Sequence, residues 1–189
     1  MRDIDIRTEL KRKEFRTHRF DPGTRVLDEM GICQGEVKID IAVINGSLQG
    51  YEIKSARDTL KRLPKQIQYY NKVFDYITIV TEKSHLEKIN HMIPSWWGIL
   101  ITLETEEGKI FLDELREPKA NIDKDKYALV QLLWKDECLE ILKDSYESKG
   151  LKNKARKFIW HKLSELYSVE ELSDLVRVTL KKRINWKDD

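Results

Sequence analysis

The sequence predicts an α/β fold, with a sheet-and-helix core over residues 1–118 and a helical C-terminal subdomain over residues 119–189. Val37, Ile39, Ile41 and Val43 alternate with polar or small residues, which is the period of a strand. Apolar residues then recur every three or four positions from Leu60 onward, which is typical of a helix with one buried face. Beyond residue 118 the pattern is wholly helical.

The core elements follow from these periodicities and from turn signals. Residues 5–15 predict an amphipathic helix, and Asn45-Gly46 marks a reversal between two strands. We expect strands at residues 25–32, 37–43, 48–55, 76–80, 98–103 and 109–112, and helices at 58–74 and 84–91. The C-terminal helices are expected at 123–148, 154–167 and 168–183.

Composition and charge exclude several classes of protein. Of the 189 residues, 40% are apolar and 36% charged, which predicts a globular chain, and the net charge of +2 leaves attraction to nucleic acid to local patches. Cys33 and Cys138 lie outside any C-x-x-C pattern, which argues against a disulfide framework or zinc site. The sequence shows no signal peptide and no apolar run that could span a bilayer, so we expect a cytoplasmic protein without a membrane partner.

Three polar residues on adjacent predicted strands indicate hydrolytic chemistry. Glu52 and Lys54 are two apart and share one face of a strand, and Asp40 lies on the preceding strand. Two carboxylates could hold a hard divalent cation that binds a phosphate oxygen and acidifies a water. Lys54 could stabilise the negative charge of the transition state or orient the nucleophile. The spacing alone is weak, because Glu-x-Lys occurs six times in the chain, but the strand context singles out Glu52.

The hairpin geometry decides whether this site can form. A two-residue turn at Asn45-Gly46 would pair Asp40 with Tyr51 and leave Asp40 and Glu52 on opposite faces of the sheet. We therefore predict a three-residue loop, Asn45-Gly46-Ser47, or a β-bulge, which would place Asp40 across from Glu52.

A basic stripe on the following helix predicts contact with a nucleic-acid backbone. Five cations stand against one acid, Asp58, between residues 57 and 72, and the alternative is a solvated cationic face. Tyr70 lies on the buried stripe and is expected in the core, as is the Trp96-Trp97 pair. The residues expected to contact nucleic acid are Arg57, Lys61, Arg62, Lys65 and Lys72.

Asp40, then Glu52-Ile53-Lys54, then Gln66-x-x-x-Tyr70 resemble the PD-(D/E)XK nuclease superfamily, and the last spacing is like that of its RecB-type exonuclease branch. Longer segments resemble an uncharacterised bacterial family of small predicted nucleases; they are residues 50–66, 94–98 and 132–137. The resemblance implies a restriction-endonuclease-like core, with a central four-stranded mixed sheet flanked by helices. In one departure, Ile39 stands where the superfamily motif has Pro.

The resemblance also implies roles for individual residues. Asp40, Glu52 and the backbone carbonyl of Ile53 would hold Mg²⁺, with Mn²⁺ able to substitute. Glu29 resembles the extra upstream acid that some members use for the metal, and the alternative is an exposed acid at a strand end. Lys54 would be catalytic. Gln66 could orient the water or contact DNA, and the alternative is a polar residue at a helix boundary. We expect a metal-dependent nuclease, with DNA favoured as substrate. The alternative is a catalytically inactive nucleic-acid or protein-binding module on the same fold. The sequence leaves open whether the substrate is DNA or RNA and whether cleavage is endonucleolytic or exonucleolytic.

Overall fold

The computed structural model describes residues 3–13, 21, 23–143, 150–184 and 186, and it is an α/β protein built on one six-stranded mixed sheet. The strands lie in chain order, β1-β2-β3-β4-β5-β6. The central strands β3, β4 and β5 are parallel, and the other neighbours are antiparallel. The strands are β1 (Arg25–Ile32), β2 (Val37–Ile44), β3 (Leu48–Lys54), β4 (Tyr76–Glu82), β5 (Gly98–Glu104) and β6 (Ile110–Arg116). The sheet is therefore wider than the four strands that the resemblance implied.

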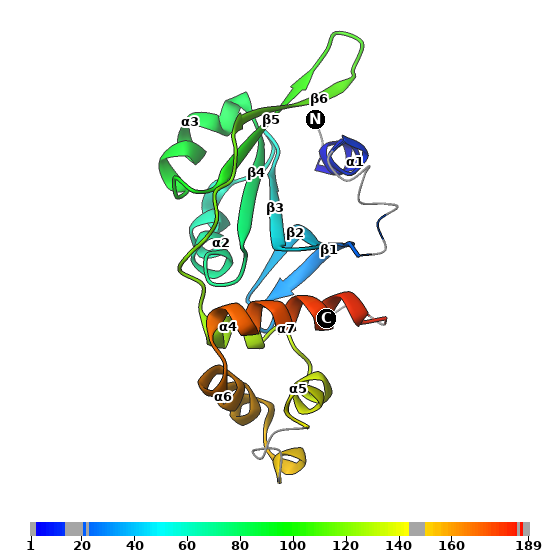
Figure 1. Cartoon of the computed structure of the whole chain (residues 1–189). Helices are drawn as coiled ribbons and strands as arrows, with labels where there is room; N and C mark the ends of the chain where they lie inside the picture. The colour runs from blue at the N-terminus through cyan, green and yellow to red at the C-terminus, as the bar shows by residue number, and fades with distance from the viewer. Residues whose placement is uncertain (1–2, 14–20, 22, 144–149, 185, 187–189) are drawn as a thin grey trace.

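Helices cover both faces of this sheet (Figure 1). Helix α1 (Asp3–Lys13) buries Ile6 and Leu10 against one face, together with Ile41, Ile53 and Val80. Helices α2 (Leu63–Tyr70) and α3 (Lys83–Met92) cover the other face. The alternation of β3 follows from this arrangement, because Ile53 packs toward α1 while its neighbours Glu52 and Lys54 lie on the side of α2.

The predicted three-residue loop between β2 and β3 is confirmed. Ile44 pairs with Leu48 and Ile41 with Tyr51, so residues 45–47 form the loop. The Asn45 carboxamide oxygen accepts a hydrogen bond from the Ser47 backbone N–H (2.9 Å), which stabilises the turn. This register brings Asp40 and Glu52 to the same level of the two strands.

The helix predicted at residues 58–74 is shorter than expected. Asp58 accepts hydrogen bonds from the backbone N–H and hydroxyl of Ser55, which fixes a turn instead of a helix start. A 3₁₀ turn, η2 (Leu60–Arg62), follows, and α2 begins at Leu63 with Pro64 in its first turn, where a missing N–H does no harm. Lys72 consequently lies beyond the helix, and the continuous basic stripe predicted from residue 57 to residue 72 does not form.

The long C-terminal helix predicted at residues 123–148 is also interrupted, and its last residues, 144–148, lie outside the described part of the chain. Asp125 caps the short helix α4 (Lys126–Val130) by accepting from the Ala128 N–H (2.6 Å). Helix α5 (Lys135–Leu142) starts anew where the Glu137 carboxylate accepts from the Trp134 N–H (2.7 Å). A 3₁₀ turn, η4 (Leu151–Asn153), α6 (Arg156–Leu166) and α7 (Val169–Lys182) complete the chain.

The C-terminal helices continue the core on the α2 side of the sheet. Their buried apolar residues, such as Trp160 and Val176, belong to the same cluster as Ile39 and Ile77 of the sheet. Asp75, after α2, pairs with Lys124 and with Arg177 of α7. The division at residue 118 stays a prediction. Within the described ranges, no helix combines the length and hydrophobicity needed to cross a membrane.

We predict that Gly98→Ala destabilises the fold. A Cβ at this position would lie 2.8 Å from Pro118 Cδ and 2.9 Å from Thr78 Oγ1, so the start of β5 would have to shift. The free energy of unfolding in urea should drop by about 1–3 kcal/mol. Gly46→Ala is the matched control, because a Cβ there meets no atom of the described part of the chain within 4 Å. Equal stability of the two variants would contradict this packing.

Candidate active site

A hollow of about 380 Å³ opens where β2 and β3 separate, between α2 and α1. It is mostly polar, and both carboxylates singled out from the sequence face it. Its lining residues include Asp3, Glu29, Lys38, Asp40, Glu52, Ile53, Lys54, Asp58, Arg62, Lys65 and Gln66. The structure thus brings together the predicted residues Asp40, Glu52, Lys54 and Gln66, with Glu29 at the same hollow.

Asp40 stands where the β2–β3 ladder ends. The paired register stops at Ile41 and Tyr51, and the Asp40 Oδ2 atom accepts a hydrogen bond from the Ile53 N–H (2.6 Å). On the other side, Glu29 of β1 has a φ of 52°, a left-handed value that distorts the backbone opposite Asp40. The Asp40 carboxylate therefore occupies the gap between the strands and replaces a backbone acceptor there.

Glu52 lies at the centre of a buried polar network and is only 1% exposed. Its Oε1 atom accepts from the Lys54 ammonium and from Gln66 Nε2 (2.6 Å). Its Oε2 atom lies 2.7 Å from the Tyr70 hydroxyl, which also contacts the Lys38 carbonyl oxygen and accepts from Gln66 Nε2 (3.2 Å). Tyr70 is in the core, as expected, yet it also holds Glu52, a role that its place on the apolar stripe did not reveal.

Burial and like charge make ionisation of the carboxyl groups unfavourable. Burial raises the pKa of Asp40 to about 7, and the neighbouring Glu52 charge adds to this effect, while the Ile53 N–H, Lys54 and Arg7 oppose it. Burial also raises the pKa of Glu52 against the opposing effect of Lys54. The pKa of Tyr70 is raised by burial and by Glu52, so its hydroxyl stays protonated and can donate.

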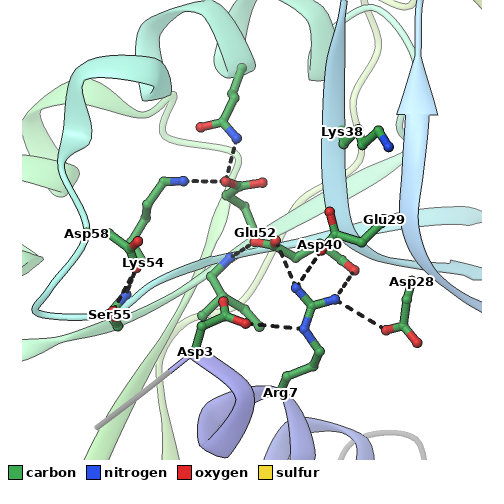
Figure 2. A network of polar contacts seen from close by, with 12 residues as sticks. Asp3, Arg7, Asp28, Glu29, Lys38, Asp40, Glu52, Lys54, Ser55 and Asp58 are labelled. Atoms are coloured by element: carbon green, nitrogen blue, oxygen red, sulfur yellow. Dashed lines mark hydrogen bonds and ion pairs between the residues drawn. The ribbon is translucent and has the colours of Figure 1, made fainter. Parts of the chain in front are cut away.

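Arg7 of α1 is a site residue that the sequence did not indicate. Its Nη2 atom lies 2.7 Å from Glu29 Oε1 and 3.1 Å from Asp40 Oδ1, and its Nη1 atom donates to the Asp40 carbonyl oxygen (2.9 Å) (Figure 2). Burial lowers the pKa of the guanidinium, but the bond to Glu29 and the charges of Asp40 and Asp3 raise it overall. The apolar residues Ile6 and Leu10 on either side of Arg7 predict which face of α1 is buried. They do not predict where on the sheet that face packs.

The predicted basic residues are distributed unevenly around the hollow. Arg62 and Lys65 line it, and Lys65 pairs with Glu36 (2.9 Å). Arg57 and Lys61 are exposed on the turn before α2. Lys72 lines a separate hollow of about 310 Å³ beside Cys33 and Tyr69.

The oxygen donors fit a hard divalent cation better than a soft one. Asp40 and Glu52 supply carboxylates, and the Gln66 Oε1 atom is buried without a hydrogen-bond partner among the described residues. Carboxylate and amide oxygens are the ligands that Mg²⁺ and Mn²⁺ accept. The described residues contain no group of three or more acidic, histidine or cysteine side chains spaced to hold a metal, so water or backbone oxygens would complete the shell.

The fold and site define an α/β protein with a hollow, lined by two carboxylates and a lysine, where β2 and β3 of its sheet separate. The chain belongs to the family described as Bacteriophage P4 protein cII, whose model matches residues 10–189. It is similar to protein cII of Enterobacteria phage P4, with 24% identity over 160 residues, which cover 84% of this chain and 59% of that protein. The chain thus spans less than two thirds of the length of this relative. No solved structure matches.

The raised pKa of Asp40 predicts a pH-dependent difference in stability between the metal-free wild type and Asp40→Asn. Since the folded pKa of about 7 exceeds the ordinary 3.8, the folded protein keeps a proton that the unfolded chain releases. Wild-type stability should therefore decline as pH rises from about 4 to about 7, whereas the amide of the variant does not titrate in this range. Urea unfolding in EDTA should be measured at about pH 5 and about pH 8. The free energy of unfolding of Asp40→Asn, relative to that of wild type, should be higher at about pH 8 than at about pH 5.

The matched control is Asp113→Asn, because Asp113 is exposed on β6 away from the hollow. This control measures how far the loss of a carboxylate distant from the hollow changes stability at the two pH values. A difference between Asp40→Asn and wild type that is independent of pH would contradict the raised pKa of Asp40.

Proposed function

We propose that this protein is a metal-dependent nuclease that hydrolyses phosphodiester bonds, with DNA favoured as substrate. The observation that supports the proposal most is the convergence of Asp40, Glu52 and Lys54 on one polar hollow from two adjacent strands. The Glu52–Lys54 pair is almost fully buried, and a buried ion pair gives little net stability. Its position in a hollow rather than in the packed core favours a chemical role.

Each of these residues has a chemical role in the proposed hydrolysis. Asp40 and Glu52 would hold Mg²⁺ or Mn²⁺, with the Ile53 carbonyl as a further candidate ligand. Glu29 is paired with Arg7 in the metal-free protein and would join them only after its side chain had moved. When bound, the cation would neutralise a phosphate oxygen and lower the pKa of a water. The Lys54 ammonium stabilises negative charge on the phosphoryl oxygens as the bond breaks. Gln66, fixed through its Nε2 atom, can accept a hydrogen bond from the attacking water at its Oε1, which has no partner among the described residues.

The rim of the hollow suits a phosphate backbone. Lys38, Arg62 and Lys65 all line it, and they are placed on β2, η2 and α2 around the carboxylates. Cations at these three positions could contact successive phosphates and keep the scissile one over Glu52 and Lys54. Arg57 and Lys61, exposed on the adjacent turn, would extend the contact, whereas Lys72 would contribute least.

A non-catalytic nucleic-acid or protein-binding module is the second candidate. It is favoured by one observation, the pairing of Asp40 with Arg7, which gives the Asp40 carboxylate a cationic partner without a metal ion. The two candidates differ in whether the purified protein turns over substrate. Cleavage of plasmid and single-stranded DNA and of RNA in Mn²⁺, compared with EDTA, would separate them: cleavage supports the nuclease, and binding without cleavage supports the module.

Two substitutions should separate metal binding from turnover. Asp40→Asn removes a charged ligand, so both Mn²⁺ affinity and cleavage should decline. Lys54→Ala keeps both carboxylates and removes a neighbouring cation, so Mn²⁺ affinity should hold or rise while the rate falls about 10²–10³-fold. Calorimetry and cleavage kinetics on the same preparations measure both quantities. Exposed Lys157→Ala in α6 is the control. Wild-type cleavage by Lys54→Ala would refute its assigned role.

A further inference from the structure

Arg7 makes contacts that resemble those of a bound cation. All three guanidinium nitrogens face carboxylates: Nε faces Asp3 (3.4 Å), Nη1 faces Asp28 (3.4 Å), and Nη2 faces both Glu29 and Asp40. The side chain is only 13% exposed, and Figure 2 shows it projecting from α1 into the middle of these acids.

The acids around Arg7 carry more charge than Arg7 can balance. Asp3, Asp28, Glu29 and Asp40 carry four formal negative charges, all within reach of the one guanidinium, and Lys11 pairs with Asp28. These two cations leave two negative charges in the group when all four acids are ionised. A divalent cation would balance them, but Arg7 occupies the place where the acids converge.

The contacts of Asp40 determine whether a divalent cation can bind there while Arg7 stays in place. Its Oδ2 atom is held by the Ile53 N–H, and its Oδ1 atom and its backbone oxygen are both held by Arg7. A divalent cation at Oδ1 would approach a guanidinium that lies 3.1 Å from the same oxygen, and this like-charge contact is unfavourable. Arg7 and a cation therefore exclude each other at Asp40.

We propose that Arg7 is an internal competitor of the divalent cation, and that metal binding at Asp40 displaces the Arg7 side chain while α1 stays docked. This inference rests on the proposed function, since it takes Asp40 to be a metal ligand. Helix α1 can stay in place because Ile6 and Leu10 are fully buried against the sheet. The displaced guanidinium keeps Asp3 of the same helix as a partner, so the exchange requires only a change of side-chain rotamer.

The test compares wild type with Arg7→Gln by Mn²⁺ calorimetry and by thermal unfolding in EDTA. Removing the competitor should tighten Mn²⁺ binding about tenfold to a hundredfold, because a charge-assisted pair no longer has to be broken. The same variant should melt at a lower temperature without metal, because Asp40 and Glu29 lose their partner. Arg12→Gln is the control, since Arg12 is exposed on the same helix and pairs with Glu9; its Mn²⁺ affinity should equal that of wild type.

The outcomes discriminate between this inference and the proposed function. If Arg7→Gln binds Mn²⁺ as tightly as wild type or more weakly, competition is wrong while the metal site stands. If neither protein binds Mn²⁺, both the proposed metal site and the proposed competition by Arg7 are wrong. Arg7→Lys keeps a cation but loses the planar fork of the guanidinium, so its Mn²⁺ affinity should lie between those of wild type and Arg7→Gln. If Arg7→Gln does not fold, Arg7→Lys takes its place in the test. An Arg7→Lys affinity equal to or weaker than that of wild type would then overturn the inference.

Discussion

The burial of the Glu52 carboxylate is the constraint on which the site depends. An ionised carboxylate removed from water is stable only when its oxygens are hydrogen-bonded or paired. Lys54 from the same strand and Gln66 and Tyr70 from α2 meet this need together. Because these partners come from two elements, the requirement also fixes how α2 lies on the sheet. The polar network thus both joins α2 to the sheet and places Glu52 and Lys54 at the hollow.

Much of this arrangement could be predicted from local pattern. The period of two in β2 and β3 places Glu52 and Lys54 on one face, and the need for Asp40 to face Glu52 required the three-residue loop that the register shows. In a strand, a shift of one residue turns every side chain to the other face, so the register decides which residues meet. The α/β class followed from the same alternation, and all six strands of the sheet were predicted from periodicity and turn signals; only the resemblance implied a narrower sheet of four strands.

Other features depend on tertiary contacts that a single sequence does not reveal. The predicted long helix breaks at Trp134, where Glu137 bonds the Trp134 backbone, and a tryptophan is not a usual start signal for a helix. Arg7 was not foreseen because its role comes from the docking of α1 beside Asp40, and no periodicity encodes that contact. The match to the Bacteriophage P4 protein cII family begins at residue 10, so Arg7 lies outside it whereas Asp40, Glu52, Lys54 and Gln66 lie within it.

The most direct test of the account is the position of a metal ion in a crystal of the protein soaked in Mn²⁺ and measured for anomalous scattering. We expect an anomalous peak in the hollow, with oxygens of Asp40 and Glu52 at about 2.0–2.6 Å from the metal ion. We also expect that the Arg7 guanidinium has moved away from Asp40 Oδ1. A peak at a different position, or the absence of any peak in the hollow at a saturating Mn²⁺ concentration, would contradict the claim that these carboxylates form a catalytic metal site.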